Sequence, residues 1–449
     1  MEKASATAQE IEGNRNSNAS NASINRVYSK DRVVHEWYRF VLSYPPHLVR
    51  DYLDKFGIDS DQRVLDPFCG TGTTVVECKL QGIPSVGIEA HPMSYFASKV
   101  KADWSPEANG LIEHANAVAE AVLSDLSTQG IEDYMLFREP LSKIELDGLR
   151  KLPENAYKLL LTNSISPLPL HKCLVLLDYL KQRRDDRYYN HELLALAKAL
   201  VTDIGNLHFG PEVGVGPAKP DAPVINSWLS SVCAMADDLR QLRGKGGTPT
   251  EIYHADARQS FSLIEPNSID AVITSPPYPN EKDYTRTTRL ETVLLGFIDD
   301  KVGLRAIKRG LMRSNTRNVY KGDDDDQWIS NHAEIQRIAD AIEARRIQLS
   351  KTSGFERLYG KVTKLYFGGM ARHLSELRKV LRPGAQLAYV VGDQASYLRI
   401  MIRTGQILGD IAQSLGYELV GIDLFRTRLA TATREQLREE VVILRWPGN

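Results

Sequence analysis

Short apolar runs with β-branched residues alternate with longer stretches of helical periodicity in the first and last parts of the chain. Runs of strand length lie at residues 64–65, 85–88, 251–254, 269–273, 386–391, 419–424 and 440–444. Stretches with apolar residues at helical spacing lie at residues 48–56, 374–381 and 407–415. This alternation predicts a doubly wound α/β sheet, with the run at 440–444 as a last strand at an antiparallel edge.

The middle of the chain breaks this alternation. Helical spacing recurs at residues 111–126, 173–180, 193–200 and 228–242. Between the last two stretches, residues 209–223 are rich in glycine and proline, and because no strand leads into them we expect a loop. The middle therefore predicts a large helical insertion.

These patterns divide the chain into four parts. Residues 1–26 are rich in Asn, Ser and Ala and predict a disordered N-terminal tail. Residues 27–104 and 251–449 are expected to form the first and second parts of the α/β domain, with residues 105–250 as the helical insertion between them. A second, basic helical insertion is expected at about 295–365.

Composition narrows the class of protein. The net charge is −1, so any nucleic-acid binding must come from a local basic face. The chain contains no run of about 18 apolar residues, and we expect no membrane span. The four cysteines never occur at Cys-x-x-Cys spacing, so no metal site is expected, and a reducing, cytoplasmic location fits.

The sequence TSPPY at residues 274–278 ends the predicted strand 269–273. In an open α/β sheet, ligands bind at the carboxyl ends of strands. The Ser275 hydroxyl and the Pro276 carbonyl could accept the protons of an exocyclic amine, since proline offers no N–H of its own. Tyr278 offers a face on which a flipped base can stack. A strand that ends in an ordinary Pro-Pro turn is the simpler interpretation of these residues alone.

The sequence DPFCGTGTT at residues 66–74 joins a strand to a helix. Gly70 and Gly72 allow a sharp turn and a close backbone approach, and the helix N-terminus suits an anionic group. About 20 residues later a second strand ends in Glu89, where nucleoside-binding α/β folds place the acid that holds ribose. Asp256 follows the strand 251–254 and either accepts an adenine amine or caps a helix.

Two charged stretches lie in the second insertion. Basic residues recur without an intervening acid at Lys301, Arg305, Lys308, Arg309, Arg313, Arg317 and Lys321. They are candidates for contacts with nucleic-acid phosphates, and a solvated helix face is the open alternative. The acidic run 323–326 is expected to face solvent, because four consecutive acids cannot all point inward.

Together the two loops resemble those of the amino-group DNA methyltransferases that use S-adenosylmethionine. The resemblance covers roughly residues 30–100, 250–290 and 370–445, and implies a Rossmann-like class I methyltransferase sheet. It also implies that nine residues hold the cofactor: Asp66, Phe68, Gly70, Gly72, Thr73, Thr74, Glu89, Asp256 and Tyr44. Ser275, Pro276, Pro277 and Tyr278 would form the catalytic loop around the target base.

The resemblance implies a site-specific methyltransferase acting on double-stranded DNA. A serine before the two prolines is typical of enzymes that methylate cytosine at N4, whereas Asp or Asn is typical of adenine-N6 enzymes. Ser275 therefore favours cytosine N4, with adenine N6 as the nearest alternative. Methylation of an RNA base amine, or a non-catalytic DNA-binding subunit, are further alternatives. A cognate restriction endonuclease is a candidate partner, and a solitary methylase is equally compatible.

Overall fold

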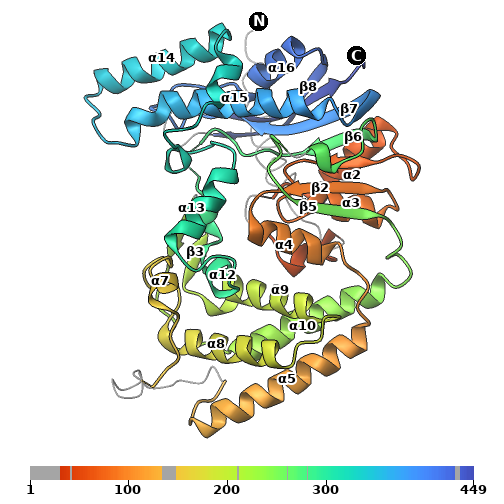
Figure 1. Cartoon of the computed structure of the whole chain (residues 1–449), viewed down its shortest axis with the longest axis vertical. Helices are drawn as coiled ribbons and strands as arrows, with labels where there is room; N and C mark the ends of the chain where they lie inside the picture. Colours follow the sequence, from red (N-terminus) through yellow and green to blue (C-terminus); the bar gives the residue numbers. More distant parts are fainter. Residues whose placement is uncertain are drawn as a thin grey trace, which may run out of the picture.

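The computed structural model describes residues 31–40, 43–133, 148–209, 212–259, 261–280, 282–429 and 435–448. The predicted tail at 1–26 lies outside the described residues. A seven-stranded sheet has the order β5-β2-β1-β6-β7-β9-β8 (Figure 1). Its strands are β5 Thr250–His254, β2 Ser85–Glu89, β1 Val64–Asp66, β6 Ile269–Thr274, β7 Leu381–Gly392, β9 Gln436–Arg445 and β8 Glu418–Leu429.

The central strands are buried on both faces, as a doubly wound sheet requires. Along β6, Val272 packs in a core with helices α15 (Tyr359–Leu377) and α16 (Thr404–Ser414). Its neighbour Ile273 points to the other face, where α2 (Pro46–Phe56) packs. This alternation follows from the two-residue repeat of a strand, and it confirms the predicted α/β fold.

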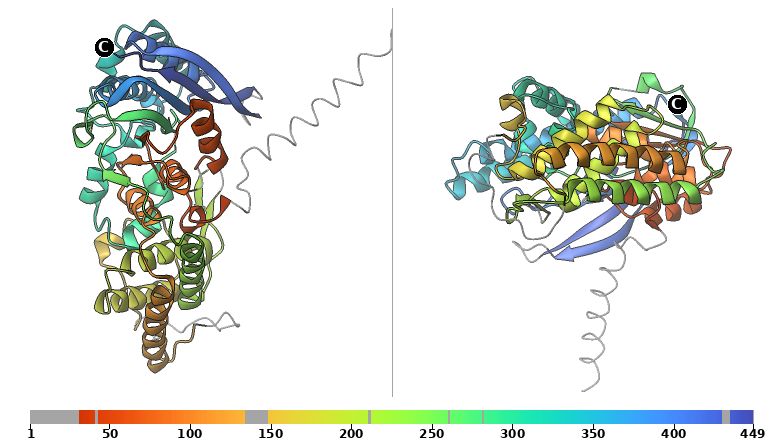
Figure 2. Two further views of the ribbon diagram at one scale, coloured as in Figure 1. Left: turned by 90° about the vertical axis from the view of Figure 1, so that its right-hand side faces the viewer. Right: turned by 90° about the horizontal axis from the view of Figure 1, so that it is seen from below.

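The segment 105–250 contributes a layer of helices at the end of the molecule away from α15 and α16 (Figures 1 and 2). Its main helices are α5 Ala108–Thr128, α8 Pro167–Gln182, α9 Tyr189–Ala199 and α10 Val224–Gln241. Their apolar faces surround Trp228, which is fully buried, and share one core with Met93 and Ala97 of α4 (Pro92–Lys101). The helical layer is thus continuous with the helix that follows β2.

The remaining elements are short or belong to the segment between β6 and β7. The other helices are α3 Thr73–Leu80, α7 Glu154–Tyr157, α11 Tyr284–Thr287, α12 Arg289–Leu294, α13 Lys301–Gly310 and α14 Ala333–Gln348. Shorter 3-10 or π turns lie at His35–Trp37, Leu200–Ile204, Phe261–Leu263, Thr316–Asn318, Asp325–Ile329 and Glu356–Leu358. Within the described part of the chain, no helix is both long and apolar enough to span a membrane.

Two details of the predicted topology were wrong. The last strand, β9, is antiparallel as expected, but it lies between β7 and β8, and β8 forms the edge. The predicted loop at 209–223 begins with a hairpin of β3 (Leu207–Phe209) and β4 (Val213–Val215). Both errors have one cause: strand order and short hairpins depend on contacts between distant segments, which local periodicity does not encode. The β8–β9 hairpin projects from the body of the molecule (Figure 2).

Candidate active site

The two predicted loops lie side by side at the carboxyl ends of the neighbouring strands β1 and β6. They border a cavity of about 280 Å³. Ten of the predicted site residues line it: Tyr44, Phe68, Gly70, Thr73, Glu89, Asp256, Ser275, Pro276, Pro277 and Tyr278. Asp66, Gly72 and Thr74 lie behind this wall. The structure therefore brings the two loops, 200 residues apart in sequence, to one site.

Asp66 joins the two loops from beneath. Its Oδ1 accepts hydrogen bonds from the Thr274 hydroxyl at 2.6 Å and from the Phe68 N–H at 3.1 Å. Its Oδ2 accepts one from the Tyr44 hydroxyl at 3.1 Å. Burial raises the pKa of Asp66 to about 6, although these bonds act in the opposite direction. The position of Asp66 fits a scaffold for both loops.

The glycine turn approaches its neighbours closely. Gly72 has a φ of 90°, and a Cβ at this position would lie 3.1 Å from the Cβ of Ser98. Gly72 also caps α3, whose first-turn Thr74 donates a hydrogen bond to the Ile273 carbonyl of β6 at 3.0 Å. A larger residue at Gly72 would therefore meet both strain and a clash.

Glu89 lies at the end of β2 with its carboxylate in the cavity wall. Its two oxygens accept the N–H groups of Gly70 at 2.8 Å and His91 at 2.7 Å. Burial raises the pKa of Glu89 to about 7, and the backbone N–H groups partly offset this effect. The acid expected to hold ribose is thus fixed directly to the glycine turn.

Lys101 is a buried cation that the sequence did not single out. Its ammonium donates to the Thr71 carbonyl at 2.8 Å and to the Tyr38 carbonyl at 3.4 Å. Burial lowers the pKa of Lys101 to about 7. The lysine holds the glycine turn against the N-terminal segment. No signal in the sequence distinguishes it from a surface lysine of α4.

The Ser275 hydroxyl donates its proton to the Val390 carbonyl of β7 at 3.1 Å. The hydroxyl also interacts with the Tyr278 side chain, and its oxygen keeps a lone pair that can accept a further hydrogen bond. Tyr278 packs against Gly392, where an added Cβ would lie 2.9 Å from the ring. Burial raises the pKa of Tyr278, so its phenol stays neutral.

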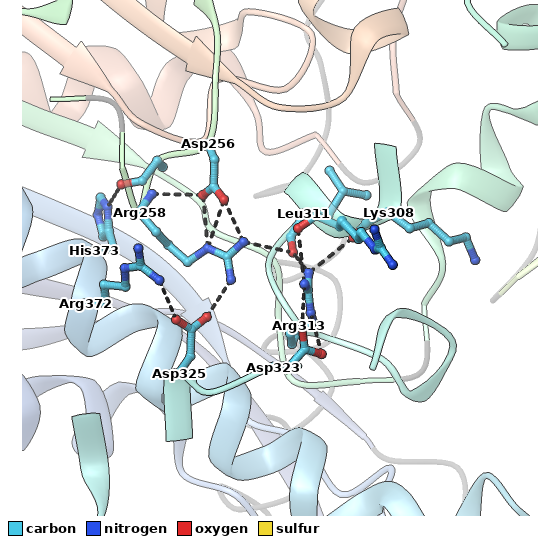
Figure 3. A network of polar contacts seen from close by, with 11 residues as sticks. Asp256, Arg258, Lys308, Leu311, Arg313, Asp323, Asp325, Arg372 and His373 are labelled. Carbon is cyan, nitrogen blue, oxygen red and sulfur yellow. Dashed lines mark hydrogen bonds and ion pairs between the residues drawn. The ribbon is translucent and has the colours of Figure 1, made fainter. Parts of the chain in front are cut away.

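Asp256 lies in the cavity wall but is also bound by a cation. The Arg258 guanidinium contacts it at 2.6 Å and contacts Asp325 at 2.5 Å (Figure 3). Arg372 also binds Asp325, at 3.1 Å. The expectation that the whole acidic run faces solvent was wrong, because Asp325 is buried between these two arginines. Asp323 likewise turns inward, to pair with Arg313.

In the structure, some residues of the basic stretch form ion pairs with acids and the others are exposed. Lys308 pairs with Asp283 at 2.7 Å, and Arg313 pairs with Asp323 at 2.8 Å. Buried pairs of this kind serve the fold and are not available to phosphates. The remaining members are exposed: Lys301, Arg305, Arg309, Arg317 and Lys321. For these five, the choice between phosphate contact and a solvated face stays open.

Other cavity residues come from segments outside the predicted loops. Lys282 follows the catalytic loop by four residues, Arg426 and Arg428 lie on β8, and Asn318 ends the turn Thr316–Asn318. Nearness to Tyr278 in the sequence was an available signal for Lys282. No comparable signal exists for Arg428 or Asn318, because only the folded chain brings them to the cavity.

The chain is similar to known DNA methylases. A family model described as DNA methylase, of the N6/N4 methyltransferase type, matches residues 3–98. The Type II methyltransferase M.BsoBI of Geobacillus stearothermophilus is 26% identical over 445 residues, which cover 93% of this chain and 85% of that protein. The Type II methyltransferase M.AvaI of Nostoc sp. is 23% identical over 458 residues, with 93% and 88% covered.

Among solved structures, the crystal structure of TrmN from Thermus thermophilus matches with a TM-score of 0.27 and 11% identity. The match covers 92% of this chain and 52% of TrmN, about half of its length. The family model and the two long matches confirm the resemblance that the loops predicted, to the amino-group DNA methyltransferases.

Proposed function

We propose that this protein transfers a methyl group from S-adenosylmethionine to the N4 amine of a flipped cytosine in double-stranded DNA. One observation carries the proposal. A single cavity is bordered by the glycine turn, the acid Glu89 and the hydroxyl of Ser275, whose proton is already donated to Val390. A cofactor cradle and an acceptor for amine protons are therefore adjacent.

The residues of the cradle fit S-adenosylmethionine by the polar groups that they offer. Gly70 and Gly72 allow close approach, Phe68 lines the cavity, and Glu89 presents a carboxylate to the ribose hydroxyls. Asp256 would accept the adenine amine while Arg258 holds its carboxylate in place. The bound cofactor supplies an electrophilic methyl group on a sulfonium.

The role of the catalytic loop follows from the weakness of the nucleophile. The lone pair of an aromatic amine is delocalised into the ring, so acceptors must hold the amine protons and favour tetrahedral nitrogen. The oxygen of Ser275 and the carbonyl of Pro276 are such acceptors, and Tyr278 provides a face for the base. Neither acceptor requires a metal ion.

Cations at the rim of the cavity fit the phosphates of DNA. Lys282 and Arg428 line the cavity, and within the described ranges neither forms an ion pair. Burial and the nearby Arg428 lower the pKa of Lys282, so the two positive charges lie close together. An anionic group between them would relieve this repulsion.

Adenine N6 remains the nearest alternative, because the same fold and cofactor serve both amines. Only Ser275 distinguishes them here, by resemblance to cytosine-N4 enzymes. Methylation of an RNA base amine is a further alternative, and a binding-only role stands further off because both loops are intact. Both long relatives are named Type II methyltransferases. We therefore propose a cognate restriction endonuclease as the partner of this protein, in a restriction–modification system.

The test is nucleoside mass spectrometry on unmethylated DNA incubated with the protein and isotope-labelled S-adenosylmethionine. Label in N4-methylcytosine is the expected result. Label in N6-methyladenine would keep the mechanism and overturn the base assignment. No label in DNA, together with tight cofactor binding, would overturn DNA as the substrate, and the same assay on RNA would follow.

A further inference from the structure

Asn318 carries a buried acceptor that the protein itself does not use. Its side chain is 1% exposed, and its Oδ1 has no hydrogen-bond partner among the described residues. The same residue lines the cavity between the two loops. A buried amide without a partner costs free energy, and a ligand that offers a hydrogen bond recovers that cost.

The position of Asn318 along the cavity follows from the contacts of its segment. The Leu311 carbonyl lies 3.5 Å from Arg258, beside Asp256 and the proposed adenine end (Figure 3). Asn315 lies at the other end of the segment, and its side-chain amide donates to the Lys282 carbonyl at 3.0 Å. The Asn318 N–H then donates to the Asn315 carbonyl at 3.2 Å. Asn318 therefore follows the part of the segment that is bonded to Lys282, four residues after the catalytic loop.

The segment is also held rigidly enough to present a side chain. The Ser314 carbonyl accepts the Tyr397 hydroxyl at 3.0 Å, and the Asn315 side chain accepts the Arg317 N–H at 3.0 Å. The turn Thr316–Asn318 is thus fixed on its N-terminal side. A side chain on such a turn keeps its place without the ligand, as a recognition residue must.

We propose that Asn318 binds the flipped target base and accepts an N–H of its exocyclic amine. This inference rests on the proposed function and adds a base contact that comes from outside both loops. A base whose edge carries a carbonyl in place of the amine would leave Oδ1 facing another acceptor. Asn318 would therefore select cytosine and adenine, which carry an amine at C4 or C6, against thymine and guanine, which carry a carbonyl at that position.

The experiment uses the full chain with Asn318→Leu, Asn318→Asp and the wild type. Asn318→Leu removes the acceptor with little change of volume, and Asn318→Asp keeps it. We expect single-turnover methylation of DNA to fall about 30- to 300-fold in the leucine variant, as for other lost base contacts. The aspartate variant should recover at least about tenfold of that loss. Affinity for S-adenosylmethionine, measured by calorimetry, should change less than about twofold in both variants.

Asn315→Leu is the matched control. Both polar groups of the Asn315 side chain are bonded within the protein, so its loss should lower the melting temperature. Asn318→Leu should lower that temperature less than Asn315→Leu or leave it unchanged, because the amide oxygen that it removes is buried without a partner. If Asn318 had only a structural role, the melting temperature would fall in both the Asn315→Leu and the Asn318→Leu variants.

Three results would overturn the inference while the wild type remains active. They are an unchanged methylation rate in Asn318→Leu, no recovery in Asn318→Asp, or a loss of cofactor affinity that matches the loss of rate. The last result would assign the contact to the amine of the cofactor's adenine. A wild type that labels no DNA amine would instead refute the proposed function, so the two failures are distinct.

Discussion

The two walls of the cavity differ in how their polar groups are used. In the wall formed by the ends of β1, β2 and β6, called the sheet wall below, Glu89 and Ser275 have protein partners that fix their orientation, and Asp66 holds the loops from behind. In the opposite wall, the Oδ1 of Asn318 has no hydrogen-bond partner among the described residues, and Lys282 lies close to the positive charge of Arg428. Glu89 and Ser275 in the first wall are thus oriented before any ligand binds, whereas Asn318 in the second would gain its partner from the ligand. The difference fits a constant cofactor on one side and a base drawn from DNA on the other.

The strongest test of the sheet wall is Gly72→Leu. We expect a loss of S-adenosylmethionine affinity above about 100-fold, because the side chain meets Ser98 and the backbone keeps a φ of 90°. Gly244→Leu is the control, since Gly244 has a φ of 85° with no atom within 4 Å of the added Cβ. Calorimetric titration of both variants, with circular dichroism to verify folding, measures the difference. Equal affinities in both would contradict the cofactor assignment.

Ser275→Ala tests the sheet wall at the catalytic loop. Loss of one acceptor for the amine protons should lower kcat about 10²- to 10³-fold, as when a donor to a developing charge is removed. Affinity for S-adenosylmethionine should stay within about twofold, because Ser275 faces the target base. Ser414→Ala removes a hydroxyl that only bonds its own helix at Ile411, and should leave kcat unchanged. A Ser275→Ala enzyme with normal kcat would refute the proposed role of the hydroxyl.

The sheet wall is also the part that the sequence predicted. A strand, a glycine turn, a helix and an acid at the end of the next strand are local patterns, and each depends on residues close in the chain. The doubly wound sheet and the juxtaposition of Gly70 with Ser275 follow from them. The division into domains stays a prediction.

The opposite wall could not be predicted for a physical reason. Its members come from Lys282, the turn at Asn318 and strand β8, and only tertiary contacts bring them together. The sequence instead indicated the basic stretch 301–321 as a candidate for phosphate contacts, because only the charges of its residues can be read from a sequence. Folding pairs Lys308 and Arg313 with acids, which composition could not reveal.

Lys282→Ala and Arg428→Ala test the opposite wall where it faces DNA. Each should weaken DNA binding about three- to tenfold and reduce the slope of log K against log salt by about one, the amount expected for one phosphate contact. Cofactor affinity should not change. Arg337→Ala is the control, because Arg337 is exposed on α14 and pairs with Glu334. Filter-binding assays at several salt concentrations give the slopes, and slopes equal to the wild type would assign both cations to solvent.

The smallest expected effect is the dependence of cofactor affinity on pH, and it tests the role of Glu89 within the sheet wall. Burial raises the pKa of Glu89 to about 7, so the carboxylate is ionised above that pH and protonated below it. The ionised form is the stronger acceptor for a ribose hydroxyl, because both of its charged oxygens keep lone pairs beyond their bonds to the N–H groups of Gly70 and His91. Through Glu89 alone, affinity for S-adenosylmethionine should therefore level off above pH 7 and fall by up to about tenfold per unit below it.

Glu89→Gln should bind the cofactor more weakly at pH 8 and lose most of this pH dependence. Lys101 titrates in the same range, since its pKa is lowered to about 7, and any slope that remains in the glutamine variant is attributable to it. Lys101 loses its charge as the pH rises, and this change weakens the hold on the Thr71 carbonyl, so its effect on affinity has the opposite sign to that of Glu89. Calorimetry between pH 6 and 8 distinguishes the two groups by that sign. An unaltered profile in Glu89→Gln would remove Glu89 from the cofactor site and leave the glycine turn as its main support.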